Sequence, residues 1–255
     1  MEKSRKGGET MPFLFLSPTT QEFNPYVTEG NEEYWMNLLA DRMEPYLFAS
    51  GINVDRNNPS GTAATAIRQS NMGNYDFHLA LHSNAAPENL AGQLRGIDAY
   101  YYPGAEAGQR MAQLVVNNLK PVYPLPDQVQ IRSSTSIGEI RQTRAPSALI
   151  EIGYHDNPQD AAWLTENLDE IAVALARAVT QYFGLPLLQP QGVQTGVVTT
   201  EETPLNIRGG PGERFPILLR IPDGTPVEVL NSYDGWYVVR VGDVVGFANE
   251  QFITL

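Results

Sequence analysis

Apolar and polar positions follow two different spacings along the first 184 residues. Short apolar runs predict buried strands at 12–17, 52–54, 77–81, 96–102 and 148–153. Between these runs, apolar residues recur at helical spacing, which predicts helices at 33–50, 60–74, 106–119 and, in one or two segments, 160–183. Strands that alternate with helices predict an α/β fold, with a mostly parallel sheet flanked by helices.

The pattern changes after residue 184. A stretch containing Pro, Gln and Gly at 185–196 is typical of a linker. After it, short strands separated by Gly- and Pro-containing turns are predicted at 197–200, 205–208, 227–231, 236–241 and 244–249. We therefore expect a flexible tail over 1–10, an α/β domain over 11–184, a linker over 185–196 and a small all-β barrel over 197–255.

Composition narrows the range of partners. The chain has 17 Lys and Arg against 29 Asp and Glu, a net charge of −12, so it lacks the basic excess that nucleic-acid binding needs. The apolar run at 11–16 is shorter than the ~7–15 residues of a signal-peptide core, and it predicts a first strand. No run approaches the ~20 apolar residues of a membrane span, so we expect no membrane insertion. The absence of cysteine excludes disulfides, thiolate metal sites and cysteine nucleophiles.

Candidate chemistry lies near the ends of two predicted strands. His82 directly follows one apolar run, and Glu151 lies inside another, where a carboxylate is costly unless it is paired or functional. Ligands of α/β sheets bind beyond the carboxyl ends of strands. With the acidic helix start at 32–33, these residues suggest a metal-assisted hydrolase, although acidic helix starts and lone histidines are more often structural. His78 lies about 13 Å along the strand from His82, so one metal ion cannot bind both.

Five segments, at 33–37, 81–85, 96–101, 140–146 and 149–158, together resemble the zinc-dependent N-acetylmuramoyl-L-alanine amidases of the Amidase_3 type, which are cell-wall hydrolases. The resemblance implies that Glu33 and His82 bind Zn²⁺ and that Glu151 is the catalytic carboxylate. Arg141, His155 and Asn84 are the candidates for contact with the substrate.

One feature departs from that family. Its first metal-binding histidine lies in a turn after the first strand, whereas the turn at 17–21 contains no histidine. Thr20 takes that position if no gap is allowed, and the next residue, Gln21, offers an amide oxygen. Gln21 is therefore the first choice for the third ligand, and His155 is the alternative. An amide should bind zinc less tightly than imidazole does. The Ser-Pro-x-x-Gln pattern of this turn resembles the turn of one subgroup of the family, so the missing histidine does not by itself imply a loss of activity.

The segments at 205–212, 235–238 and 246–248 resemble the bacterial SH3 domain, which implies binding to wall peptides, although Trp236 could equally be a core residue. The sequence therefore predicts an extracellular or wall-located autolysin-like enzyme. It would cleave the amide between N-acetylmuramic acid and L-alanine of peptidoglycan. One alternative is a wall-binding protein whose amidase fold has lost activity. Another is a zinc peptidase of different bond specificity.

Overall fold

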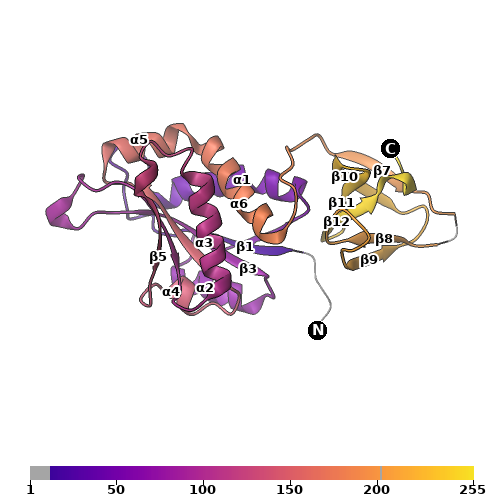
Figure 1. The fold of residues 1–255 in the computed structure, drawn as a ribbon, viewed down its shortest axis with the longest axis horizontal. Helices are drawn as coiled ribbons and strands as arrows, with labels where there is room; N and C mark the ends of the chain where they lie inside the picture. Colours follow the sequence, from indigo (N-terminus) through magenta and orange to yellow (C-terminus); the bar gives the residue numbers. More distant parts are fainter. Residues whose placement is uncertain (1–11, 202) are drawn as a thin grey trace. The chain divides into compact units, whose positions relative to one another are not determined.

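A computed structural model describes residues 12–201 and 203–255, and the expected tail over 1–10 lies outside the described residues. The chain divides into two compact units (Figure 1). One contains Phe13–Glu44 and Val54–Phe183, and the other contains Pro45–Asn53 and Gly184–Leu255. Among the described residues, no helix is long and apolar enough to cross a membrane.

The first unit is built on a six-stranded sheet in the order β2-β1-β3-β6-β4-β5. Strands β1, β3 and β6 are parallel, β4 is antiparallel to β6, and β5 is parallel to β4. The expected mostly parallel sheet is therefore confirmed. The strands are β1 Phe13–Pro18, β2 Asn53–Arg56, β3 Phe77–Asn84, β4 Ile97–Tyr101, β5 Val129–Ser133 and β6 Ser147–Tyr154.

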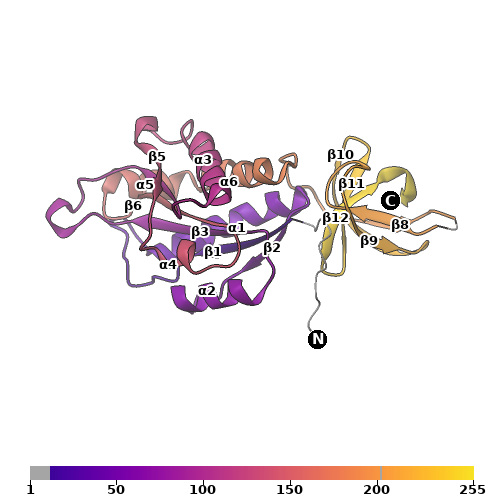
Figure 2. The same cartoon turned by 60° about the horizontal axis from the view of Figure 1, so that its bottom comes forward.

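Helices cover both faces of this sheet. Successive side chains of a strand point to opposite faces: the ring of Phe77 packs against Tyr182 at a centroid distance of 4.8 Å, whereas Nδ1 of His78 lies 3.0 Å from Ser70 Oγ. Tyr182 belongs to α6 and Ser70 to α2, which appear on opposite sides of the sheet in Figure 2. The helices are α1 Glu32–Ala49, α2 Ala63–Met72, α3 Glu106–Leu119, α4 Gly138–Arg141, α5 Pro158–Glu166 and α6 Leu168–Phe183.

The buried carboxylate of Asp160 joins helix α5 to strands β4 and β6. Asp160 Oδ1 accepts hydrogen bonds from Arg95 Nε at 2.8 Å and from the Tyr123 hydroxyl at 2.6 Å. Its Oδ2 accepts from the backbone N–H groups of Gly96 and Tyr154, at 3.0 and 3.1 Å. Because Gly96 immediately precedes β4 and Tyr154 ends β6, one side chain fixes both strand termini.

In the first unit the sequence pattern missed β5 and α4 and ended β3 too early, and in the second unit it missed β9 (Ile217–Ile221) and β13 (Ile253–Thr254). Only the first residue of β5, Val129, is buried, so this edge strand carries little apolar signal. The single turn of α4 is too short to show helical periodicity. Strand β3 continues past residue 81 to Asn84, which places His82 inside the strand rather than after it.

The second unit is a seven-stranded sheet in the order β13-β7-β10-β11-β12-β8-β9, and the pairings given for it are antiparallel. The expected all-β module is confirmed. Its first strand begins at Gln194, within the stretch expected to be linker. The strands are β7 Gln194–Val198, β8 Leu205–Arg208, β9 Ile217–Ile221, β10 Pro226–Tyr233, β11 Trp236–Val241, β12 Val244–Asn249 and β13 Ile253–Thr254. The core is aliphatic, formed by residues such as Val198, Ile207, Val229, Val239 and Ile253.

Candidate active site

The candidate site forms where three parallel strands end. Pro18 of β1 pairs with Leu81 of β3, and the next residue, His82, pairs with Glu151 of β6. The β3–β6 register shifts directly afterwards, where Gly153 has a φ of 72° that disfavours other residues. Irregularities of this kind re-aim side chains next to functional sites. The imidazole and the carboxylate thus lie side by side on neighbouring strands.

Helix α1 contributes a carboxylate from its first turn. Asn31 caps the helix, because its Oδ1 accepts from the N–H of Tyr34 at 2.8 Å. Glu32 follows and is buried, with Oε1 3.0 Å from His82 Nδ1 and 3.2 Å from the N–H of Ser83. The structure brings Glu32, rather than the expected Glu33, to His82.

The neighbouring Glu33 points in another direction. Adjacent residues of a helix lie about 100° apart around its axis, so only one of the two carboxylates can face the strand ends. The Oε1 of Glu33 accepts from Asn37 Nδ2 at 3.0 Å, one turn along the same helix.

Gln21 meets His82 from the turn after β1. Its Nε2 lies 3.3 Å from His82 Nδ1. Asn24 Nδ2 links the two other polar groups, at 3.3 Å from Gln21 Oε1 and 2.6 Å from Glu32 Oε2. Two side chains, Gln21 from the turn after β1 and Glu32 from α1, therefore converge on Nδ1 of His82.

The opposite ring nitrogen of His82 contacts a carboxylate that sequence reasoning missed. Glu139 Oε2 lies 3.0 Å from His82 Nε2, and its Oε1 lies 3.2 Å from His78 Nε2 and 2.7 Å from Ser17 Oγ. Two histidines four residues apart on one strand share a face and need a polar partner when buried. That spacing was the available signal, but α4, which carries Glu139, was not predicted.

These contacts set the charges of the centre. Burial by itself would lower the pKa of His82, but hydrogen bonds to Glu139 and Glu32 outweigh it and raise that pKa well above its usual range. Burial opposes ionisation of Glu139, yet the bonds from His78 and His82 hold its pKa well below the ordinary value. The pKa of Glu32 is lowered as well, because bonds from His82 and Asn24 offset its burial. The metal-free centre is thus an imidazolium between two carboxylates.

Glu151 has the opposite character. Its Oε2 is buried without a hydrogen-bond partner. Burial is the largest influence on its pKa; His82 opposes it and Glu32 and Asp98 add to it, which together raise the pKa to about 7. A carboxylate poised near neutral pH can accept and release a proton during a reaction.

The three residues expected to contact substrate occupy different surroundings. His155 is buried; its Nδ1 lies 3.1 Å from the carbonyl oxygen of Ser83, and its ring stacks on Tyr26 at 5.6 Å. Asn84 Oδ1 accepts from the N–H of Ala85 at 2.9 Å. Arg141 is exposed at the last residue of α4.

The donor groups around His82 Nδ1 fit a zinc ion of mixed ligation. Within the described residues, no three His, Asp or Glu side chains are arranged to hold a metal ion, so a zinc ion bound here would take its third donor from the amide of Gln21 or from a water. Two ligands bound ~2.0 Å from a tetrahedral zinc lie ~3.3 Å apart. The 3.0 Å separation from Glu32 and the 3.3 Å separation from Gln21 are of this size. A half-turn of the Gln21 amide would present its oxygen instead of its nitrogen and would give up the bond from Asn24 Nδ2.

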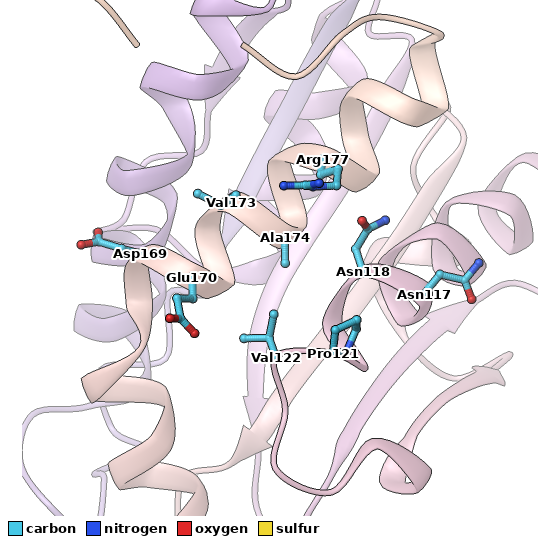
Figure 3. A pocket seen from close by; sticks show the side chains of 9 residues that line it. All are labelled: Asn117, Asn118, Pro121, Val122, Asp169, Glu170, Val173, Ala174 and Arg177. Carbon is cyan, nitrogen blue, oxygen red and sulfur yellow. The ribbon is translucent and has the colours of Figure 1, made fainter. Parts of the chain in front are cut away.

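A hollow of ≈ 500 Å³ lies elsewhere, between the end of α3 and α6 (Figure 3). Asn117, Asn118 and Val122 line it on one side, and Glu170 and Arg177 line it on the other. None of the groups at the strand ends faces this hollow, so its size does not identify it as the reactive site.

An α/β sheet that carries a carboxylate beside an imidazole at its strand ends has the groups for acid–base chemistry, which hydrolases use. A sequence profile of N-acetylmuramoyl-L-alanine amidase matches residues 22–181, more than half of the chain. The chain therefore belongs to the N-acetylmuramoyl-L-alanine amidase family, as the resemblance implied. Residues 203–254 match the bacterial SH3 domain. No curated protein matches the sequence.

Solved structures support the fold assignment. The amidase AmiC2 of Nostoc punctiforme is 17% identical, with a TM-score of 0.59, and the match covers 69% of this chain and 99% of that one. The catalytic domain of CwlV from Bacillus (Paenibacillus) polymyxa var. colistinus is 19% identical, with a TM-score of 0.60, covering 69% and 100%. An amidase from Clostridium difficile 630 is 18% identical, with a TM-score of 0.60, covering 69% and 98%.

Proposed function

We propose that the protein is a zinc-dependent amidase that cleaves the bond between N-acetylmuramic acid and L-alanine of the peptidoglycan stem. The observation that carries this proposal is Glu151, a half-buried residue with one buried, unpartnered carboxylate oxygen, paired in register with His82. Family membership gives the reaction class, and we locate the reaction at Glu151 and His82.

Glu151 takes the proton from the attacking water and delivers it to the nitrogen of the leaving L-alanine. In the metal-free protein, burial raises the pKa of this carboxyl to about 7, which supports a group that binds and releases a proton near neutral pH. Arg141 and Asn84 remain the candidates for contact with substrate. His155 supports the site from behind, because it holds the backbone of Ser83.

Zinc would be held by Glu32, His82 and Gln21. When bound, it supplies a Lewis acid that polarises the amide carbonyl and acidifies water. Gln21 is favoured over His155 as the third ligand because its amide lies against His82 Nδ1, whereas Nδ1 of His155 is engaged by Ser83.

The second unit would retain the enzyme on its polymeric substrate and so raise the local substrate concentration. A hollow of ≈ 170 Å³ lined by Trp236, Phe252 and Arg208 is where we place the wall peptide. Such a protein works outside the membrane, at the cell wall. We assign the boundary between catalytic domain and linker near residue 184.

The test is hydrolysis of purified peptidoglycan by the zinc-loaded protein, with products identified by mass spectrometry. Release of stem peptides with a free N-terminal L-alanine supports the proposal. Products cut within the stem would indicate a peptidase instead.

A second candidate, a wall-binding protein without activity, is favoured by one observation: the turn at 17–21 lacks the family's metal-binding histidine, and Gln21 offers only an amide there. Retention on peptidoglycan without release of any product by the zinc-loaded protein would establish this alternative.

A further inference from the structure

We propose that Glu139 is a positioning residue that holds the imidazole of His82 with Nε2 protonated, so that Nδ1 is the nitrogen left for the metal ion. The inference rests on the proposed zinc site, but it concerns a residue outside the ligand set.

Glu139 is itself held firmly. It is 4% exposed, and its two oxygens have different partners. Oε1 lies 2.7 Å from Ser17 Oγ and 3.2 Å from His78 Nε2, and Oε2 lies 3.0 Å from His82 Nε2. Because the buried His78 holds one oxygen, the other is directed at His82.

His78 is a rigid part of this support. It is fully buried, its Nδ1 lies 3.0 Å from Ser70 Oγ, and its ring stacks on Phe15 at 5.3 Å with an interplanar angle of 18°. A fully buried histidine that is stacked on Phe15 and bonded to Ser70 cannot follow Glu139 if the carboxylate shifts. His78 on β3 thus holds the carboxylate of Glu139 in place, and Glu139 in turn holds the imidazole of His82.

The geometry determines which ring nitrogen carries the proton once a metal is bound. A carboxylate oxygen accepts but does not donate, so the Nε2 beside Glu139 must keep its hydrogen. The lone pair of the neutral ring then lies on Nδ1, the atom that faces Glu32 and Gln21. Metal-binding histidines generally donate their other N–H to a carboxylate or carbonyl in this way.

The experiment measures zinc affinity by chelator competition, without reference to activity. Glu139→Gln and Glu139→Ala should weaken zinc binding by roughly 10- to 100-fold, the usual cost of removing such a partner. Ser17→Ala is the matched control, because it removes a buried bond to the same carboxylate but not the one to His82. It should change affinity less than threefold. Circular dichroism checks that each variant is folded.

A spectroscopic readout separates positioning from stability. In the zinc-loaded protein with ¹⁵N-labelled histidine, His82 should show a protonated Nε2 with a slowly exchanging hydrogen, and Glu139→Ala should lose that protection. Equal affinity losses in Ser17→Ala and Glu139→Gln would overturn the inference, as would a wild-type protein that binds no zinc. Zinc binding that depends on Glu139 in a protein that hydrolyses nothing would sustain it and would refute only the proposed activity.

Discussion

At the scale of single residues, Glu151 is held in a site that favours its neutral form. It has a buried oxygen with no donor, although neighbouring acidic groups are satisfied by His82, Asn24 or Ser17. Such a group costs stability in the resting protein and is useful only if it moves a proton.

Glu151→Gln should lower turnover on peptidoglycan by roughly 10²-fold or more, because proton transfer is lost while shape is kept. Zinc stoichiometry should not change, since Glu151 is outside the ligand set. Product release measured by mass spectrometry, with metal analysis of the same sample, checks both. Near-normal hydrolysis by this variant would remove Glu151 from the mechanism.

The same substitution should stabilise the metal-free protein above neutral pH. The folded pKa of Glu151, about 7, is raised from 4.5. The proton on Glu151 therefore makes its full contribution to the free energy of unfolding below pH 4.5, and this contribution is lost as the pH rises through 7. Glu151→Gln avoids the cost of ionisation, which is about 3 kcal/mol at most. Urea unfolding with chelator should show a more stable variant at pH 8 and a much smaller difference at pH 4.5; a pH-independent difference would contradict this.

The third ligand can be assigned by substitution. Gln21→Ala should abolish residual zinc binding, and Gln21→His should tighten it by roughly tenfold or more, because imidazole is the better zinc ligand and each ~1.4 kcal/mol is tenfold. His155→Ala should leave stoichiometry intact. Zinc loss in His155→Ala but not in Gln21→Ala would reverse the assignment. No change in either variant would favour the inactive wall-binding protein.

At the scale of elements, the spacing of apolar residues along the sequence predicted the helices and strands whose side chains are buried. The helix at 106–119 was predicted to the residue, and the strands around Phe77 and Leu149 were found, because their side chains are buried. The pairing of His82 with Glu151 follows from parallel neighbouring strands, whose order the sequence does not state.

What periodicity missed depends on tertiary contact. Which of Glu32 and Glu33 faces His82 depends on how α1 is oriented against the strand ends. The sequence alone does not distinguish two adjacent glutamates. Glu139 lies in a single helical turn, and its function depends on partners 57 and 61 residues away in sequence.

Asp160 provides a test of how elements are joined. Asp160→Ala leaves the N–H groups of Gly96 and Tyr154 and the Tyr123 hydroxyl without an acceptor, so it should reduce the free energy of unfolding by about 3 to 5 kcal/mol. Asp160→Asn keeps the shape and one acceptor oxygen and should lose less. Denaturant unfolding of both variants checks this, and equal losses would show that acceptor number is unimportant.

At the scale of the whole molecule, the two units predict separable functions. The main boundary between the units falls after Phe183, and the second unit also contains Pro45–Asn53. Deletion of residues 190–255 should leave a folded protein that still hydrolyses soluble muramyl peptides but binds intact walls weakly. Sedimentation with purified walls and product analysis measure the two properties. An insoluble truncated protein would show that the boundary is misplaced.

The imidazolium held between Glu32 and Glu139 has a consequence for the order of maturation. The proton on His82 Nδ1 occupies the position that we assign to zinc, so the centre has a positive charge between its carboxylates whether or not metal is present. Folding therefore does not have to wait for metal. Each zinc ion taken up displaces one proton. Under the proposed zinc dependence, the polypeptide would fold in a dormant form and would become active when it binds zinc.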